Sequence, residues 1–429
     1  MTQTERSEIN FSFASLLRNA PILKKVLYIS YDGMTDPLGQ SQVIPYLLGL
    51  AAKGHSITVL SCEKRENYPK LKAHNEERFA AAGIDWQYVF YSKRPPVFST
   101  FYDLMRMASK AREIAKAKDI EVVHCRTILS TLIGASLKKK LGTKLVFDIR
   151  GFWADERVEG DLWNLDNPLY KRMYNYFKRK ESEYFSLADH IITLTDTAKN
   201  WIEAQDWPGG PVPPIRAIPC AVNLEHFSQA STNEAAVIAN AKQLGIGPDD
   251  FVLTYLGSLG TRYMLRDMMT FFKVLHEEIP NARFLFITRD NHDHIRALAA
   301  ELGIPNDALL VIPSTYNDIP NLLALAHASI FFIKTGFSGK AVSPTKQAEL
   351  LSMGIPIVCN NGIGDCDAIL EGNNVGVVLH ELNEARYREA AQQLKKLSVK
   401  PKADIRQVAL DYFSLEAAVE NYNKVYEAI

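Results

Sequence analysis

Short runs of apolar residues alternate along this chain with longer segments in which apolar residues recur every three or four positions. The short runs are typical of buried strands, and the longer period is typical of amphipathic helices. The predicted strands of the first half cover residues 26–30, 56–61, 86–91, 121–124, 144–148, 190–194 and 215–219. Those of the second half cover residues 251–256, 283–288, 309–312, 329–333, 356–359 and 376–379. This alternation predicts an α/β protein with parallel sheets covered by helices on both faces.

The length of the chain and one break in its pattern predict two domains. A chain of 429 residues is too long for one ordinary core. Its clearest punctuation is the segment Trp-Pro-Gly-Gly-Pro-Val-Pro-Pro at 207–214. We predict an N-terminal extension at 1–23, doubly wound Rossmann-like domains at 24–222 and 223–414, and a final helix at 415–429. Doubly wound sheets bind ligands at the carboxyl ends of their strands, so we expect a site in a cleft between the domains.

Composition and charge exclude several classes of protein. The chain has 49 basic and 49 acidic residues, a balance that argues against a general nucleic-acid binder. Its five cysteines lack CxxC spacing and fit reduced thiols in a cytoplasmic protein. No apolar run approaches the length of a membrane-spanning helix, and residues 1–23 lack the pattern of a signal peptide. We therefore expect a cytoplasmic protein.

The segment from Ser343 to Glu349 is the most informative stretch for chemistry. Ser343 suits an N-cap and Pro344 suits the first helical position. Thr345 and Lys346 then fall where free backbone N–H groups and the helix dipole favour an anion such as phosphate. Glu349 lies three residues after Lys346, on the same helix face, where it could accept hydrogen bonds from a ribose diol. The alternative is an ordinary capped helix before a strand.

In each predicted domain, one glycine-containing segment follows the first strand. Gly257, Ser258 and Arg262 follow the strand at 251–256 and suit a diphosphate, with Arg266 as a second basic candidate. The loop at 32–41 carries glycines that let the backbone approach a ligand closely. The alternatives are a surface turn and a flexible connection. Neither segment contains GxGxxG, which argues against a dinucleotide dehydrogenase.

Charged and aromatic residues crowd the ends of two strands in the first domain. Asp148 and Arg150 could position a reacting hydroxyl and a leaving phosphate, or they could form a structural ion pair at the edge of the sheet. Trp153 follows them on the acceptor side. His124 and Arg126 end a neighbouring strand, and a packed histidine is the favoured interpretation of His124.

Two further patterns have mainly structural interpretations. Asp365 and Asp367 imitate the DxD pair of some sugar-nucleotide enzymes, but aspartates that cap turns or helices explain them better, and we expect no metal site. Residues 168–185 mix aromatic and basic side chains. They could rest on an anionic membrane, although an amphipathic helix packed on its own sheet is favoured.

With these features in place, the chain from residue 24 to residue 429 resembles the retaining GT-B glycosyltransferases of family 4. The likeness is carried by the loop after the first strand, Ile-Pro-Cys-Ala-Val-Asn at 218–223, Tyr-Leu-Gly-Ser-Leu-Gly at 255–260 and the block at 343–358. The resemblance implies a GT-B fold whose last helix crosses back to the first domain. It indicates a sugar-nucleotide site without specifying the sugar.

The resemblance also implies roles for single residues. Glu349 matches the second glutamate of the family's E-x7-E pattern, which binds the ribose of the nucleotide. Gly39 and the adjacent Gln40 fall in the loop that approaches the donor diphosphate, and Lys346 would lie near the same phosphates. Asp148 stands where many members carry a histidine of the catalytic site.

Departures from the family pattern bear on activity. Ala341 occupies the place of the first glutamate, and the usual Arg-x5-Lys phosphate pair would fall at Ser258 and Met264. Arg262 or Arg266 could substitute for that pair. The departures mark either a divergent subgroup with its own phosphate clamp, which we favour, or a weakened enzyme.

Together these observations predict a hexosyl-type glycosyltransferase that moves sugar from a UDP- or GDP-sugar to a hydroxyl of a carbohydrate or lipid-linked acceptor, without a metal or other cofactor. The resemblance implies retention at the anomeric carbon. It also implies polysaccharide, lipopolysaccharide or glycolipid assembly at the inner face of the membrane. Two other classes stay open: a non-catalytic sugar-nucleotide-binding scaffold and a GT-B-related sugar-nucleotide epimerase.

Overall fold

The computed structural model describes residues 23–95 and 98–429, so most of the predicted extension at 1–23 lies outside the described residues. Its first sheet has seven strands in the order β3-β2-β1-β4-β5-β6-β7. They are β1 (Lys25–Ser30), β2 (Ser56–Glu63), β3 (Asp85–Phe90), β4 (Val122–Arg126), β5 (Lys144–Asp148), β6 (His190–Thr193) and β7 (Ile215–Ala217). β1 and β2 pair in parallel, with Tyr28 opposite Val59. β1 is buried after its first residue, because helices cover a parallel sheet on both faces.

The second sheet has six strands in the order β10-β9-β8-β11-β12-β13. They are β8 (Phe251–Leu256), β9 (Ala282–Ile287), β10 (Leu309–Ile312), β11 (Ala328–Phe331), β12 (Ile357–Asn360) and β13 (Gly376–Leu379). Every predicted strand is present, with ends that differ by a residue or two. The chain is therefore an α/β protein with two doubly wound sheets, as the hydrophobic pattern predicted.

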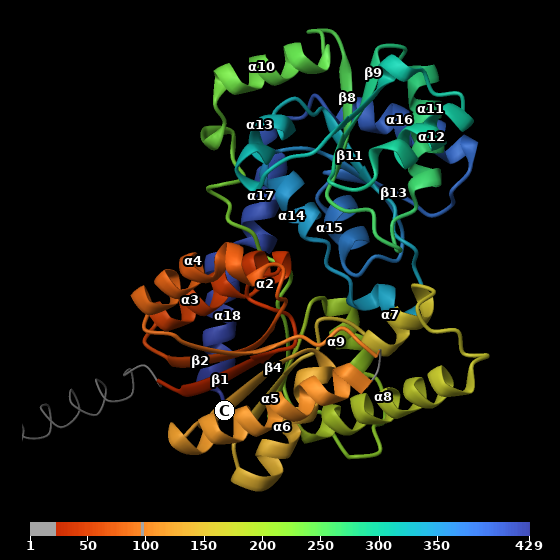
Figure 1. The fold of residues 1–429 in the computed structure, drawn as a ribbon. Helices are drawn as coiled ribbons and strands as arrows, with labels where there is room; N and C mark the ends of the chain where they lie inside the picture. Colours follow the sequence, from red (N-terminus) through yellow and green to blue (C-terminus); the bar gives the residue numbers. More distant parts are fainter. Residues whose placement is uncertain (1–22, 96–97) are drawn as a thin grey trace, which may run out of the picture. The chain divides into compact units, whose positions relative to one another are not determined.

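Helices connect consecutive strands, and three more helices follow the last strand, β13 (Figure 1). Those of the first half are α2 (Pro37–Gln42), α3 (Ile44–Ala52), α4 (Tyr68–Ala81), α5 (Phe98–Ala117), α6 (Thr127–Leu141), α7 (Trp153–Glu159), α8 (Pro168–Leu187) and α9 (Asp196–Glu203). Those of the second half are α10 (Glu234–Leu244), α11 (Leu265–Glu278), α12 (His292–Glu301), α13 (Ile319–Leu323), α14 (Thr345–Ser352), α15 (Cys366–Gly372), α16 (Glu384–Leu397), α17 (Lys402–Phe413) and α18 (Leu415–Glu427). Short 3-10 turns lie at η1 (Gln229–Ser231), η2 (Asn306–Ala308), η3 (Tyr316–Asp318) and η4 (Phe337–Ala341). None of the described helices combines the length and apolar character needed to cross a bilayer.

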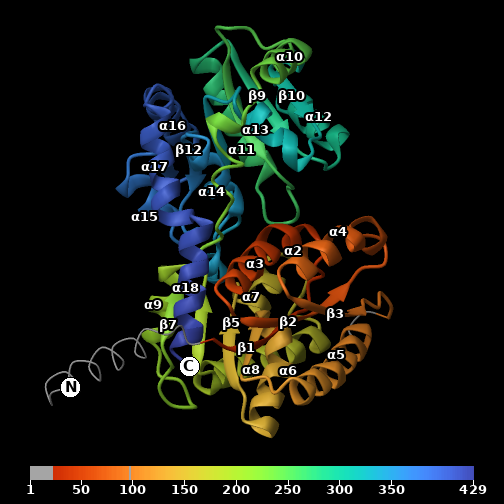
Figure 2. The same cartoon turned by 90° about the vertical axis from the view of Figure 1, so that its left-hand side faces the viewer.

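The chain divides into two compact units. Among the described residues, one unit takes in those up to Cys125 together with 132–146 and 419–429, and the other takes in 126–131 and 147–418. The last turns of α18 belong to the first unit, where the C-terminus lies near the start of β1 (Figure 2). The Tyr426 hydroxyl lies 2.7 Å from Nδ1 of His124, and Lys24 donates to the carbonyl of Ile429 over 2.6 Å. The final helix therefore returns to the N-terminal part of the chain, as the resemblance implied.

The second sheet and its helices form the core of the second unit. α11 packs on α16 on one face of the sheet, and α14 packs on α17 on the other. α14 follows β11 in the chain after the turn η4 and precedes β12, so its N-terminus lies at the carboxyl edge of the parallel strands. That edge is where doubly wound sheets place their ligands.

Candidate active site

The N-terminus of α14 lacks a capping side chain. The helix begins at Thr345 with Pro344 at the N-cap position, so the prediction of Ser343 as N-cap was wrong. The Ser343 hydroxyl instead accepts a hydrogen bond from the backbone N–H of Cys220 over 3.1 Å. The contact with Cys220 thus uses the hydroxyl oxygen that would otherwise have capped α14. In the first turn, Gln347 donates its N–H to the carbonyl of Pro344 over 2.9 Å, and no side chain caps the helix. The positive end of the helix dipole at Thr345 and Lys346 still favours an anion.

Lys346 is the most unusual side chain at this helix start. It is 7% exposed, and its Nζ lies 4.0 Å from the ring centroid of Tyr255 and 3.7 Å from that of Tyr263. Within the part of the chain that the structure describes, Nζ has no hydrogen-bond partner. Burial lowers the pKa of Lys346 well below its ordinary value, while Glu349 and Asp290 act in the opposite direction. An ammonium that faces two aromatic rings, with the carboxylate of Glu349 one turn away, is suited to meet a phosphate.

Glu349 lies one turn after Lys346 and is half-buried. Burial raises the pKa of its carboxyl to about 7, and the charge of Lys346 limits the rise. Burial, with a contribution from Glu349, raises the pKa of Tyr316 to about 12, and Glu349 acts in the same direction on Tyr263. The carboxylate of Glu349 therefore lies near two tyrosines and beside Lys346. Hydroxyl donors such as a ribose diol would stabilise its ionised form.

The segment after β8 is held by Asp290. Gly257 has φ +98° and Gly260 has φ +52°, conformations that glycine adopts without strain. The Ser258 hydroxyl lies 3.1 Å from Oδ2 of Asp290, which also accepts the backbone N–H of Leu259 over 2.5 Å. Ser258 is thus engaged with a carboxylate. A Cβ on Gly257 would lie 3.8 Å from Lys346 Nζ, so this glycine borders the lysine directly.

The two arginines that could replace the missing phosphate pair have different surroundings. Arg262 donates to the Ser338 hydroxyl over 3.0 Å, and its Nη1 lies 3.6 Å from Oε1 of Glu156. Arg266 is held in an exposed ion pair with Glu301 at 2.9 Å. Arg262 is therefore better placed than Arg266 to replace the missing phosphate-binding pair. Its partner Ser338 belongs to η4, the turn directly before α14.

The carboxylates of α7 were missed by sequence reasoning. Glu159 accepts the backbone N–H of Ser338 over 3.1 Å and also binds its hydroxyl. Burial raises the pKa of Glu156, while the charge of Arg262 lowers it. Their spacing of three residues on a short helix was the available signal, since it places both on one face. These contacts hold η4 directly before the start of α14.

Asp148 and Arg150 are both buried at the end of β5. Their side chains are 1% and 5% exposed, and Arg150 Nη1 lies 4.0 Å from Asp148 Oδ2. Arg150 also has φ +52°, an uncommon conformation for a residue with a side chain, which costs about 1–3 kcal/mol. Its Nη2 contacts the sulfur of Cys220 at 3.5 Å, and Cys220 in turn donates its N–H to Ser343. A series of contacts through Arg150 and Cys220 therefore links Asp148 to Ser343. Ser343 is the residue before the N-cap of α14.

Two family models match the chain. The model described as Glycosyltransferase Family 4 matches residues 43–226, and the model described as Glycosyl transferases group 1 matches residues 237–409. This chain belongs to the family 4 type of GT-B glycosyltransferase. A search of curated proteins found no match.

Solved structures share the fold of this glycosyltransferase. A sucrose-phosphate synthase from Thermosynechococcus elongatus is 14% identical with a TM-score of 0.72, covering 94% of this chain and 98% of that one. Anabaena HepE in complex with UDP-glucose is 12% identical with a TM-score of 0.67, covering 95% and 100%. WaaG, a glycosyltransferase involved in lipopolysaccharide biosynthesis, is 15% identical with a TM-score of 0.65, covering 93% and 99%. At these identities the likeness shows the fold alone.

The loop after β1 in this glycosyltransferase is shorter than the predicted loop at 32–41, because the helix α2 begins inside it at Pro37. Pro37 begins α2, and a Cβ on Gly39 would lie 2.2 Å from the carbonyl oxygen of Gly33. Gln40 donates to the carbonyl of Met34 over 2.6 Å. Gly39 therefore allows the backbone of α2 to lie close to the backbone at Gly33. The hydrogen bond from Gln40 to Met34 stabilises this contact.

The acceptor-side candidates pack against aromatic rings or inside the sheet. His124 is fully buried, with its ring 4.6 Å from that of Tyr28. Arg126 is buried at the end of β4. Trp153 packs on Phe177 at 4.8 Å. The structure thus matches the interpretation of His124 as a packed histidine.

The glycosyltransferase packs the aromatic face of α8 inward. Tyr184 is buried, Phe177 contacts Trp153, and Tyr174 donates to Asp155 over 2.8 Å. Lys178 lies 2.7 Å from Asp155 and also pairs with Glu181. The exposed basic side chains of the helix are Lys171, Arg172 and Arg179.

The aspartates of the DxD-like sequence have structural partners. Asp365 accepts the backbone N–H of Asp196 over 2.7 Å and that of Thr197 over 2.9 Å, and Asp367 accepts that of Gly362 over 3.0 Å. Among the described residues, no group of three or more histidine, cysteine, aspartate or glutamate side chains could hold a metal ion.

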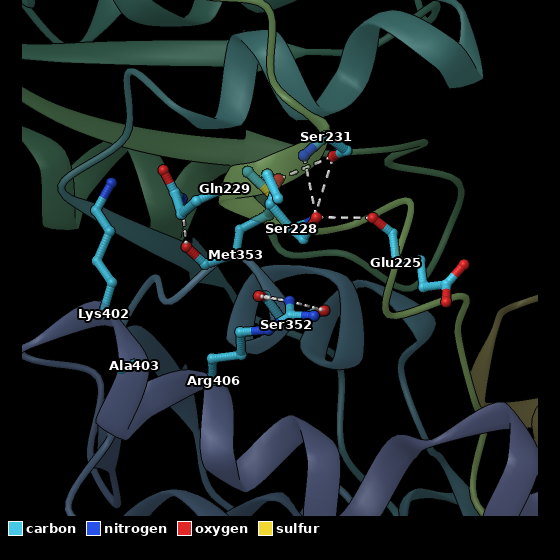
Figure 3. Close-up of a pocket in the computed structure, with 10 residues that line it drawn as sticks. Glu225, Ser228, Gln229, Ser231, Ser352, Met353, Lys402, Ala403 and Arg406 are labelled. Atoms are coloured by element: carbon cyan, nitrogen blue, oxygen red, sulfur yellow. Dashed lines mark hydrogen bonds between the residues drawn. The ribbon is translucent and has the colours of Figure 1, made fainter.

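A hollow of about 590 Å³ lies at the opposite end of α14 from Lys346 (Figure 3). Its lining includes Ser352 and Met353 at the end of the helix. Arg406 braces this end, donating to the carbonyls of Phe227 and Leu224 over 2.6 Å each. None of the predicted site residues lines this hollow, so we assign the chemistry to the N-terminal end of α14.

Proposed function

We propose that this glycosyltransferase moves a sugar from a nucleotide-diphosphate sugar to an acceptor hydroxyl. The observation that carries the proposal is the pair Lys346 and Glu349 on one face of α14. The lysine presents a buried cation without a hydrogen-bond partner among the described residues, and the glutamate presents an acceptor one turn away. A nucleoside diphosphate has the matching pattern, with phosphates one ribose away from a vicinal diol.

In this proposal the charge that develops on the leaving diphosphate is stabilised by three groups. They are the N-terminus of α14, the ammonium of Lys346 and the guanidinium of Arg262. In some other sugar-nucleotide enzymes a divalent metal ion stabilises the charge on the leaving diphosphate. Because these cations would do so here, we propose transfer without a metal. Asp148 and Arg150 would orient the acceptor hydroxyl, and the resemblance favours retention at the anomeric carbon.

For the donor we propose a UDP-sugar first and a GDP-sugar second. Anabaena HepE, which shares the fold, is solved in complex with UDP-glucose. For the setting we propose polysaccharide, lipopolysaccharide or glycolipid assembly at the cytoplasmic face of a membrane, since WaaG acts in lipopolysaccharide biosynthesis. A carbohydrate or lipid-linked acceptor follows from that setting.

The test is isothermal titration of the protein with UDP, GDP, ADP and CMP and their common sugar conjugates, with and without EDTA. We expect one base to bind with an affinity that EDTA leaves unchanged. Binding that EDTA abolishes would reject the metal-independent site. No binding by any nucleotide would reject the donor site itself.

A non-catalytic sugar-nucleotide-binding protein is the second candidate. It is favoured by the engagement of Ser258 with Asp290 and by the apolar Ala341, which is buried where the family carries an acid. Such a protein would bind the nucleotide sugar but neither hydrolyse nor transfer it. Donor turnover measured with the base that binds separates the two functions.

A further inference from the structure

Helix α5 exposes an apolar face along its first two turns. Phe98, Phe101, Tyr102 and Met105 are 74%, 63%, 52% and 49% exposed. Their positions repeat at intervals of three and four, so they form one stripe on the helix. Large apolar side chains are usually exposed singly, and a contiguous group of this kind marks an interaction surface.

The opposite face of α5 is anchored, so the exposed stripe does not result from a loosely attached helix. Its buried residues are Ser99, Asp103, Met107, Ala111, Ile114 and Ala115. Asp103 accepts the backbone N–H of Ser92 over 2.8 Å and the hydroxyl of Tyr31 over 3.4 Å. The stripe is therefore presented to solvent by a fixed helix.

A basic pocket lies beside the second turn of α5, next to Tyr102 of this stripe. A hollow of about 320 Å³ is lined by Arg65, Lys93 and Arg106, with Glu66 as its one acidic residue. Glu66 pairs with Lys93. The guanidinium of Arg106 lies 5.5 Å from the ring centroid of Tyr102, which joins the pocket to the apolar stripe. The chain as a whole is neutral, so this cationic excess is local.

We propose that the α5 stripe and the basic pocket together dock this protein on an anionic phospholipid bilayer. The aromatic and methionine side chains would enter the interface, and the three cations would meet lipid phosphates. A second copy fits less well, because a two-fold contact through this face would bring the cations of both copies together. The helix at 168–185 also fits less well, because its aromatic face is packed inside the protein.

The position of this surface suits a lipid-linked acceptor, a step that rests on the proposed function. The pocket lies at the carboxyl ends of β2 and β3, the edge at which the segment after β1 also lies. Glu63, the last residue of β2, accepts the hydroxyl of Thr35 over 2.5 Å, and the adjacent Lys64 pairs with Asp36 at 2.9 Å. Docking would therefore bring the loop that precedes Gly39 toward the lipid surface.

Vesicle flotation of the full chain tests the proposal. The vesicles are phosphatidylcholine alone or phosphatidylcholine with phosphatidylglycerol. We expect binding only to the anionic vesicles, weakening as salt rises. A Phe98→Ser/Phe101→Ser variant and an Arg65→Gln/Lys93→Gln/Arg106→Gln variant should each lower the partition coefficient by about tenfold or more.

Matched controls remove the same groups elsewhere. A Lys171→Gln/Arg172→Gln/Arg179→Gln variant removes three exposed cations from α8. A Leu410→Ser/Tyr412→Ser variant removes two apolar side chains that are 41% and 45% exposed. Both controls should float as the wild type does. Thermal unfolding of every variant confirms that the fold is intact.

Three outcomes would overturn the proposal. They are absence of wild-type binding to anionic vesicles, equal flotation of both α5 variants and the wild type, and loss of binding in the α8 variant alone. If both α5 variants float as the wild type does, sedimentation without lipid shows what the stripe binds instead. A dimer that the α5 substitutions dissociate would assign the stripe to a second copy. Titration with the nucleotide sugar in the absence of vesicles shows separately whether the donor site works, so the two proposals fail independently.

Discussion

The ammonium nitrogen of Lys346 lies 3.7 Å from the ring centroid of Tyr263 and has no hydrogen-bond partner in the described part of the chain. A ring face returns only part of the free energy that an ammonium loses when it leaves water. The lysine therefore destabilises the empty site, and an anion would offset that cost.

Replacing this lysine separates binding from stability. In Lys346→Met we expect the Kd for the nucleotide diphosphate to rise about tenfold to a hundredfold, because a charge-assisted contact is worth about 1.5–3 kcal/mol. We also expect an equal or higher Tm, since the variant removes a poorly compensated buried charge. Titration calorimetry and thermal unfolding measure the two effects. The control is Lys395→Met, an exposed position on α16, which should leave the affinity unchanged.

Donor affinity should rise between pH 6 and pH 8. Burial raises the pKa of Glu349 to about 7, and the ribose diol favours the ionised carboxylate, so binding strengthens as the proton leaves. The expected gain is about fivefold to tenfold for a nucleotide sugar, whose diphosphate diester does not titrate in this range. In Glu349→Gln we expect weak donor affinity that does not change between pH 6 and pH 8. A wild-type profile with no slope would remove Glu349 from ribose binding.

The same carboxyl affects folding. Since its pKa rises from an ordinary value of 4.5 to about 7 in the folded protein, the folded state holds a proton that the unfolded chain releases. The contribution of Glu349 to the free energy of unfolding therefore falls as pH rises from about 4.5 to 7. Denaturant unfolding across this range should show a shallower decline in Glu349→Gln. A parallel decline in both proteins would contradict the assignment.

Glu159 should order the segment before α14. Glu159→Gln keeps an acceptor for the Ser338 N–H but removes its charge, and Glu159→Ala removes both. We expect amide exchange at Ser338 to accelerate modestly in the first variant and more strongly in the second, with a loss of about 1 kcal/mol in stability for Ala. Hydrogen exchange with mass spectrometry measures both. Unchanged exchange in Glu159→Ala would show that η4 is held without this carboxylate.

Asp148 should act on turnover and not on donor binding. In Asp148→Asn we expect kcat to fall about a hundredfold while the Kd for the nucleotide stays within about twofold, because the residue would orient the acceptor or stabilise charge on the sugar. Steady-state transfer and nucleotide titration give the two values. Wild-type turnover would make the contact with Arg150 a purely structural ion pair.

The strands and the fold class followed from the sequence, because each apolar run between polar turns has one stable place in a parallel sheet. The placement of Lys346 and Glu349 on one helix face also followed from the sequence, since a spacing of three residues fixes both side chains on the same face wherever the helix lies. These relations hold between residues that are close in the sequence, so they can be read from the sequence alone.

Contacts between segments distant in the chain decided the rest. The Ser343 hydroxyl serves Cys220, 123 residues away, in place of the predicted cap. Phe177 and Tyr174 of α8 turned inward because Trp153 and Asp155 lie against them. The apolar residues of α5 stayed outside because Asp103 and its neighbours fill the buried face. A helical pattern shows that a helix has two faces, but which face meets the core, and whether a hydroxyl caps its own helix or another strand, depends on the partners that folding brings near.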